Sequence, residues 1–229
     1  MKAPKLASSG DGRDTRWDEH RSARHERLLA AALDLIDREG GDVGVAAIAA
    51  EAEIPRSVVY RLFRDRDDLD EQIRGRIIDD LMESISPALA PSGTVREAVR
   101  AAIETYVDWV TRHPHLHLFL SLGSATRRSV GSRAVTGTKT AIALNVSALI
   151  SETLLSRGEG DGQPQGTADN LAFGLVGLVD SVVNRWVAHP ESRSTAEALG
   201  EFLTNAACAL IETTARAAGT GIGLDDALR

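Results

Sequence analysis

Residues 44–66 read GVAAIAAEAEIPRSVVYRLFRDR, and this stretch decides the fold of the N-terminal part of the chain. Two short apolar segments, 45–53 and 55–63, are separated by the pair Ile54-Pro55. Proline disfavours a helical residue before it and suits the first turn of a new helix, where its missing N–H is not needed. The spacing therefore predicts two short helices joined by a tight turn, which is the size of a helix-turn-helix.

The second segment has two chemically different faces. In a helix-turn-helix, the second helix lays its N-terminal turn in the major groove, so it needs an apolar inner face and a polar or cationic outer face. Helical spacing puts Val59, Leu62 and Phe63 on the inner face. Arginine forks onto guanine O6 and N7, and Ser or Tyr hydroxyls reach phosphates. The outer face consists of Arg56, Ser57, Tyr60 and Arg61.

The distribution of charge along the chain agrees with DNA binding better than the net charge of the whole chain does. The 229 residues carry a formal net charge of −7, and all of that excess lies in residues 67–229. Residues 54–66 instead carry four arginines against Asp65 alone, a local charge of +3. On composition alone, a solvated helix face is the better explanation of these arginines. An anion-binding surface is therefore expected here only because the helix pattern surrounds it.

The rest of the chain also has helical periodicity. A first helix is expected from about residue 20 to Gly40-Gly41, and a long fourth helix is expected to begin at Asp65. Loops and breaks then separate five more helices, and no period-2 segment of strand length is present. We expect an all-α fold of about nine helices. Its parts are a mobile arm (1–19), a three-helix DNA-binding domain (20–66), a larger helical ligand-binding and dimerisation domain (67–217) and a frayed tail (218–229).

Three segments around the helix-turn-helix resemble the TetR-type transcriptional regulators. They are RLLAAAL (27–33), VAAIAAEAEI (45–54) and SVVYRLFRDRDDL (57–69). The resemblance covers roughly residues 20–75, and its spacing is specific. It implies a homodimer that brings two helix-turn-helix units to a palindromic DNA operator. It also implies a C-terminal domain that binds a small effector, and repression that is released when the effector binds.

The chain departs from this family's pattern at three places. Gly44 stands where a capping threonine is usual, so a phosphate contact there has to come from a backbone N–H. Glu53 begins a turn that usually contains glycine, so it has to adopt a strained conformation or the turn differs. Arg66 stands where lysine is usual, and either side chain suits a phosphate. The expected DNA-contacting residues are Arg21, Arg24, Gly44, Val45, Arg56, Ser57, Val58, Tyr60, Arg61 and Arg66.

The expected effector pocket lies between the fifth and eighth helices. Residues 168–188 are apolar nearly all round, so this helix needs cover on every side, which a two-fold partner supplies together with residues 194–217. Asp180 and Asn184 are either polar anchors in a pocket or hydrogen-bonding groups at a dimer interface, and Asn145 is similar. A mostly apolar lining favours a hydrophobic or amphipathic effector. The expected lining residues are Tyr106, Trp109, Phe119, Asn145, Phe173, Val176, Gly177 and Asp180.

The sequence does not predict a metal site, a reactive thiol or a catalytic site. His113, His115 and His117 alternate along the chain, so they do not converge on one metal ion, and one of them is expected to face a cavity while the others face solvent. The lone Cys208 is expected to be a packed thiol. Without a nucleophile motif, a phosphate-binding glycine loop or a run of 18 apolar residues, we expect no catalytic site, no cofactor, no membrane span and a cytoplasmic protein. A ligandless helical adaptor is the alternative function.

Overall fold

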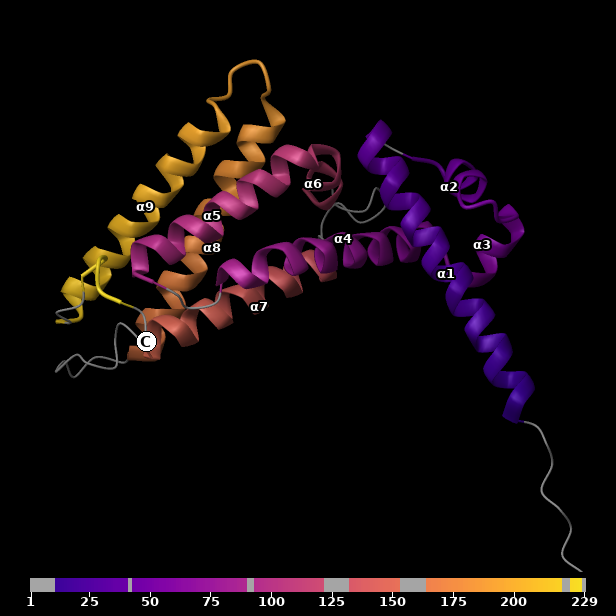
Figure 1. Ribbon diagram of the computed structural model, residues 1–229, viewed down its shortest axis with the longest axis horizontal. Helices are drawn as coiled ribbons and strands as arrows, with labels where there is room; N and C mark the ends of the chain where they lie inside the picture. Colours follow the sequence, from indigo (N-terminus) through magenta and orange to yellow (C-terminus); the bar gives the residue numbers. More distant parts are fainter. Residues whose placement is uncertain are drawn as a thin grey trace, which may run out of the picture.

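The computed structural model describes residues 11–40, 43–89, 93–121, 132–152, 164–219 and 223–227. Within these ranges the chain is all-α, as expected, and the only β pairing is an isolated bridge between Thr94 and Ala227. Figure 1 shows the small N-terminal helices standing apart from the C-terminal bundle. The described residues form the helices α1 (Asp11–Glu39), α2 (Val45–Glu51), α3 (Arg56–Leu62), α4 (Arg66–Leu89), α5 (Val95–Arg112), α6 (Pro114–Ser121), α7 (Arg133–Ile150), α8 (Pro164–Ala188) and α9 (Ala196–Ala217).

Helices α1 to α3 are held together by a small apolar core. Leu28 and Ile36 on α1 are at most 1% exposed, and they belong to one buried cluster with Ile48 of α2 and Val59 of α3. α1 ends at Gly40, whose φ of +66° favours glycine. A Cβ atom at Gly40 would also lie 2.9 Å from the His115 ring, so this glycine lets α1 end directly against α6.

The long helix α4 connects the N-terminal unit to the bundle (Figure 1). It starts where the sequence predicts, because the backbone N–H of Asp68 donates to the Asp65 carboxylate over 2.8 Å. Its apolar stripe faces inward along its whole length. The buried members of the stripe are Leu69, Ile73, Ile77, Leu81 and Ile85.

The C-terminal bundle is built around α5. Thr94 and Glu97 form a reciprocal capping box at its start. α5 packs against α4 on one side and α9 on the other, while α7 runs alongside α8. Cys208 on α9 is buried, as expected, and burial raises the pKa of its thiol.

Helix α8 is the one described helix that is long and apolar enough to cross a membrane, by length and composition alone. A core helix of a soluble protein meets the same criterion. Only 28% of its apolar stretch is buried, because one stripe faces the bundle and the opposite stripe faces outward. The expectation that α8 is covered on all sides therefore does not hold within a single protomer.

Three boundary predictions are wrong. α1 begins at Asp11, so part of the expected arm is helical, and residues 1–10 lie outside the described residues. α8 begins at Pro164, four residues before the expected start at residue 168. Part of the expected frayed tail is packed: Leu224 is buried, and its carbonyl accepts a 3.0 Å bond from the Arg96 N–H.

Candidate functional site

Helix α3 presents the two faces that its sequence predicts. Val59 is 2% exposed, and Phe63 is buried at the end of the helix. Leu62 and Val58 are half-buried and pack against the same core. Exposed side chains form the other face. They are Arg56, Ser57, Tyr60 and Arg61.

Arg56 and Tyr60 form a pair on that exposed face. The Arg56 guanidinium donates to the Tyr60 hydroxyl from Nη2 over 2.9 Å and from Nε over 3.3 Å. The spacing of four residues brings the two side chains together on one helix face. The contact limits the rotamers of the guanidinium while other N–H groups remain available to an acceptor. The exposed face of α3 thus carries a partly ordered hydrogen-bond donor.

The turn between α2 and α3 holds a strained residue. Glu53 has a φ of +54°, so the chain tolerates the left-handed conformation where the family pattern has glycine. The guanidinium of Arg27 on α1 donates to the Ala52 carbonyl over 2.8 Å and fixes the turn against α1. Gly44 caps α2 without a side-chain hydrogen bond, next to a half-buried Val45.

The remaining arginines in the predicted DNA site differ in how far their side chains are exposed and how they are held by neighbouring groups. Arg21 is exposed, whereas Arg24 is half-buried, and its buried Nε has no hydrogen-bond partner. Arg66 is held by its own helix, because its Nε lies 2.7 Å from an Asp70 carboxylate oxygen. A phosphate would have to compete with Asp70 for Arg66.

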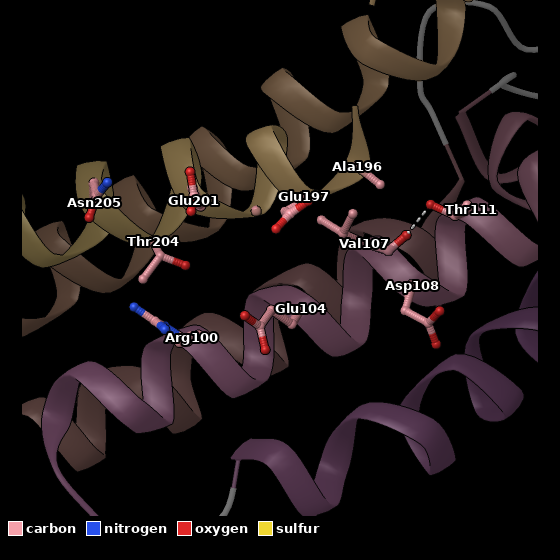
Figure 2. Close-up of a pocket in the computed structure, with 11 residues that line it drawn as sticks. Arg100, Glu104, Val107, Asp108, Thr111, Ala196, Glu197, Glu201, Thr204 and Asn205 are labelled. Carbon is pink, nitrogen blue, oxygen red and sulfur yellow. Dashed lines mark hydrogen bonds between the residues drawn. The ribbon is translucent and has the colours of Figure 1, made fainter. Parts of the chain in front are cut away.

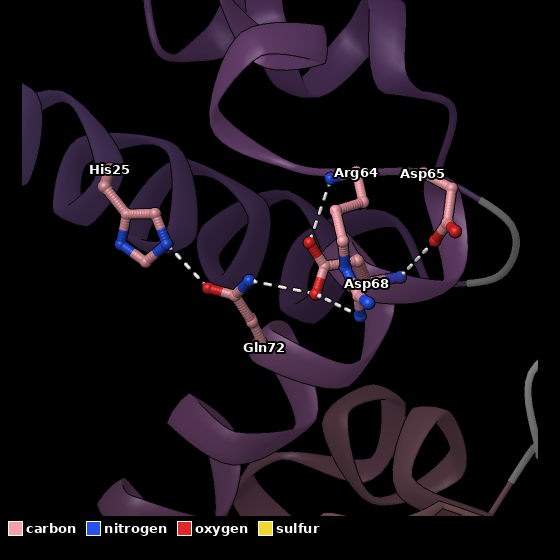
Figure 3. A network of polar contacts seen from close by, with 5 residues as sticks. All are labelled: His25, Arg64, Asp65, Asp68 and Gln72. Atoms are coloured by element: carbon pink, nitrogen blue, oxygen red, sulfur yellow. Dashed lines mark hydrogen bonds and ion pairs between the residues drawn. The ribbon is translucent and has the colours of Figure 1, made fainter.

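A polar network that the sequence analysis missed braces the start of α4 (Figure 3). His25 of α1 hydrogen-bonds Gln72 over 2.6 Å and stacks on Phe63. Gln72 donates to Asp68, which also accepts a 2.9 Å bond from the Arg64 backbone N–H. That backbone bond is the main cause of a lowered Asp68 pKa. The network fixes α3 relative to both neighbouring helices.

A second missed contact joins the two parts of the molecule. The Asp37 carboxylate on α1 bonds His113 Nδ1 over 2.8 Å. The Asp37 carbonyl bonds His115 Nδ1 over the same distance. The expectation that these two histidines face solvent is wrong, because the end of α1 covers them. His117, the third histidine, points inward and is 3% exposed.

His117 belongs to an interior cluster of polar side chains contributed by α5 to α8. Burial lowers the pKa of His117, and its Nε2 is buried without a hydrogen-bond partner although Asn184 lies nearby. Burial and the Asp180 carboxylate together raise the pKa of Tyr106, whose ring meets His117 edge-on. Asp180 pairs with Lys139 over 2.7 Å. This cluster is a place where a ligand would find unsatisfied polar groups.

The predicted effector-binding residues divide into two sets. Trp109 and Phe119 are buried, and Val176 is half-buried together with Tyr106 and Asp180. Three others do not point into the bundle. Phe173 is 46% exposed, and Asn145 and Gly177 are also exposed. For these three, the prediction of an internal position is wrong, because apolar surroundings in the sequence do not say which side of a helix is covered.

The structure also contains a groove of about 550 Å³ between α5 and α9, and none of the predicted effector residues lines it. Figure 2 shows its walls as two antiparallel helices with mostly polar side chains between them. No sequence pattern predicts this groove, because its residues come from two helices about 100 positions apart.

Known proteins resemble both parts of this architecture. The family model described as bacterial regulatory proteins, tetR family, matches residues 28–73, which contain α2, α3 and the start of α4. An uncharacterised HTH-type transcriptional regulator of Mycobacterium tuberculosis is 26% identical over 91% of this chain and 88% of its own length. A TetR-like transcriptional regulator from Rhodococcus sp. RHA1 is 25% identical, with a TM-score of 0.55 over 80% of this chain and 93% of its own.

Residues 28–73 form a DNA-binding domain of the tetR family, and the chain as a whole is similar to TetR-type transcriptional regulators. The match to the family model falls on the helices that form the exposed Arg56–Tyr60 face. A TetR-family regulator from Streptomyces coelicolor, 20% identical, shares the fold with a TM-score of 0.64 over 86% of this chain and 88% of its own. DNA binding and transcription regulation are thus the function of this TetR-type protein.

Proposed function

We propose that this TetR-type regulator is a cytoplasmic homodimeric repressor that a small hydrophobic or amphipathic effector releases from a palindromic operator. The observation that carries the proposal is the exposed face of α3, where Arg56 is preset by Tyr60 and braced from behind by a buried core. A donor group held in a fixed position suits direct reading of a base edge in the major groove.

Contacts with DNA follow from the position of each side chain around α3. Arg56 and Tyr60 project from its first turns, so they meet the floor of the groove. Arg21 and Arg24 on α1 and the N-terminal N–H groups of α2 flank α3, so they meet the backbone phosphates. The full proposed set is Arg21, Arg24, Gly44, Val45, Arg56, Ser57, Val58, Tyr60, Arg61 and Arg66.

The dimer forms through α8 and α9. The outer stripe of α8 carries Phe173, and the outer side of α9 carries Phe202 and Leu210, which are 55% and 44% exposed. Large apolar side chains at these exposures favour burial by a second copy. A two-fold arrangement lets the same patch on each protomer cover its partner. A partner there also supplies the cover that α8 lacks.

The effector binds at the interior cluster of Tyr106, His117 and Asp180. An orphaned Nε2 atom on His117 gives a ligand one hydrogen bond that the protein does not satisfy, and the surrounding helices are mostly apolar. The effect of the ligand reaches the DNA-binding unit through α6, which carries His117, because His115 of α6 and His113 just before α6 both bond Asp37 of α1. Effector and operator then weaken each other's binding by the same factor.

The test starts with operator fragments selected from a random DNA pool by the purified full chain. We expect Arg56→Ala to weaken operator binding by about 1–3 kcal/mol and to relax base preference at one position of each half-site, because a forked contact to guanine is lost. Fluorescence anisotropy at fixed salt measures both effects. Arg216→Ala removes an exposed arginine from α9 and is the matched control.

Two results would contradict the proposal. Equal weakening on operator and random DNA would make Arg56 a phosphate contact and not a base-reading residue. Failure of the wild-type chain to select any DNA sequence would favour the adaptor alternative. A palindrome among the selected sites would support the dimer.

A further inference from the structure

The α5–α9 groove has the size and composition of a ligand site that is separate from the interior cluster. Its volume of about 550 Å³ lies in the range of small-molecule sites. Its floor is buried and consists of Val107 on α5 with Gly200 and Thr204 on α9. The absence of a side chain at Gly200 leaves space between the helices. A solute that enters the groove would therefore meet a largely desolvated floor.

Thr204 gives the first indication of what the groove binds. This residue is 3% exposed, yet none of the described residues hydrogen-bonds its hydroxyl, which faces the groove in Figure 2. Thr105 and Thr111 on α5 instead donate to carbonyls of their own helix over 2.7 Å. The hydroxyl is therefore free to bond with a polar group that enters the groove.

The walls carry charges that the protein does not neutralise. Within the described part of the chain, no ion pair involves Glu104, Glu197 or Glu201. Asp108 is the exception, since Arg112 holds it at 2.6 Å. Arg100 is the cation of the lining, and it also has no ion-pair partner among the described residues. The unneutralised groups therefore sum to about two negative charges, which favours a ligand with net positive charge.

The charges are ordered along the groove. Figure 2 places Arg100, Thr204 and Glu201 at one end of the groove, and of these Arg100 and Thr204 are hydrogen-bond donors suited to a carboxylate. Glu104 is one helical turn further along α5, a rise of about 6 Å. Glu197 lies beyond it on the antiparallel helix. A ligand with an anionic end and cationic groups spaced along its length would match this order.

We propose that this groove binds a small basic zwitterion that carries one carboxylate and two amino groups, with the chemistry of a lysine-containing dipeptide. The carboxylate meets Arg100 and the Thr204 hydroxyl, and the amino groups meet Glu104 and Glu197. A pure polyamine leaves Arg100 unpartnered and is repelled by it. A single neutral amino acid is too short to reach both sets of groups.

The groove stays open in the proposed dimer. Phe202 of the proposed interface is two residues from both Gly200 and Thr204, and two residues correspond to about 200° around a helix. The groove and the exposed Phe202 therefore lie on opposite sides of α9. The site needs neither the dimer nor the interior cluster, so it is independent of the proposed function.

Isothermal titration of the full chain with lysylglycine tests the site. We expect saturable binding at one site per protomer. Glu104→Gln should weaken it at least about tenfold, because a charge-assisted hydrogen bond is lost, and the isosteric Thr204→Val should also weaken it. Glu83→Gln, an exposed carboxylate on α4, is the matched control and should leave binding unchanged. Thermal melting of each variant shows that it is folded.

The C-terminal amide of lysylglycine tests the anionic end of the site. Arg100→Gln should weaken binding of lysylglycine and leave binding of the amide unchanged. The proposal is overturned if the wild-type chain binds no lysylglycine, or if Glu83→Gln weakens binding as much as Glu104→Gln. It is also overturned if spermidine binds as tightly as lysylglycine and Arg100→Gln affects neither, which would make the groove a site for cations alone.

Discussion

The exposed face of α3 and the interior of the C-terminal bundle both depend on polar side chains, but they hold them differently. On α3, Arg56 finds its partner one helical turn away, and both side chains stay in solvent. In the bundle, Ser147 of α7 hydrogen-bonds Asp169 of α8 over 2.5 Å. Polar pairs of the first kind serve recognition, and pairs of the second kind fix helices to each other.

The largest effect should come from breaking a pair of the second kind. Ser147 is 1% exposed, so Ser147→Ala removes one buried donor from the Asp169 carboxylate and should lower the free energy of unfolding by about 1–3 kcal/mol. Chemical denaturation measures the change. Ser84→Ala is the control, because Ser84 is exposed and bonds only its own helix. Equal losses in the two variants would remove the distinction between the two kinds of pair.

Asp68 offers a test that depends on pH. Its pKa is lowered in the folded protein, mainly by the Arg64 backbone N–H, so its contribution to stability is present above the unfolded pKa of about 3.9 and is lost as the pH falls through the folded value. Asp68→Asn should cost about 1–2 kcal/mol at pH 7 and much less at pH 2. Urea titrations of both proteins at the two pH values measure this loss of stability. A cost that does not change with pH would assign the effect to packing.

A smaller effect is expected when the hydrogen bond between Arg56 and Tyr60 on α3 is removed. Tyr60→Phe removes the hydroxyl that accepts from Arg56, and since Tyr60 is 53% exposed, the melting temperature should not change. Operator affinity should fall by about 0.5–1.5 kcal/mol, because one hydrogen bond is lost and Arg56 is less ordered. Anisotropy and calorimetry on the same sample separate the two outcomes. A large drop in melting temperature would place Tyr60 with the structural pairs.

The smallest effect concerns the strained turn. Glu53 is exposed and has a φ of +54°, so Glu53→Gly should stabilise the chain by about 0.5–1 kcal/mol, because relief of the left-handed strain outweighs the added entropy of the unfolded chain. Thermal unfolding measures the gain. Glu51→Gly, in the adjacent helix, should destabilise instead. Destabilisation by both would mean that the Glu53 side chain makes a favourable interaction that outweighs its backbone strain.

The features that could be predicted from the sequence are those that depend on residues close together in the chain. The cap at Asp65, the stripe from Leu69 to Ile85 and the two faces of α3 depend on residues within one or two helical turns, so periodicity alone identifies them. The same reasoning did not find the contacts of Asp37 with His113 and His115, which are more than 70 positions away. It also misplaced Phe173, because both sides of α8 are apolar and only the packing of neighbouring helices shows which one is covered.

Because of the bonds at Asp37, helix α1 is a rigid helix that is held to the bundle near one end. Its 29 residues span about 44 Å, and the bonds to α6 hold it near its C-terminal end. If α6 shifted enough to tilt α1 by about 5° about that end, the far end of the helix would move by about 4 Å. The Arg27 bond to the α2–α3 turn lies between the two ends, so α3 would move by a smaller amount in the same direction. A small tilt of α1 at the bundle would thus move the DNA-binding helix.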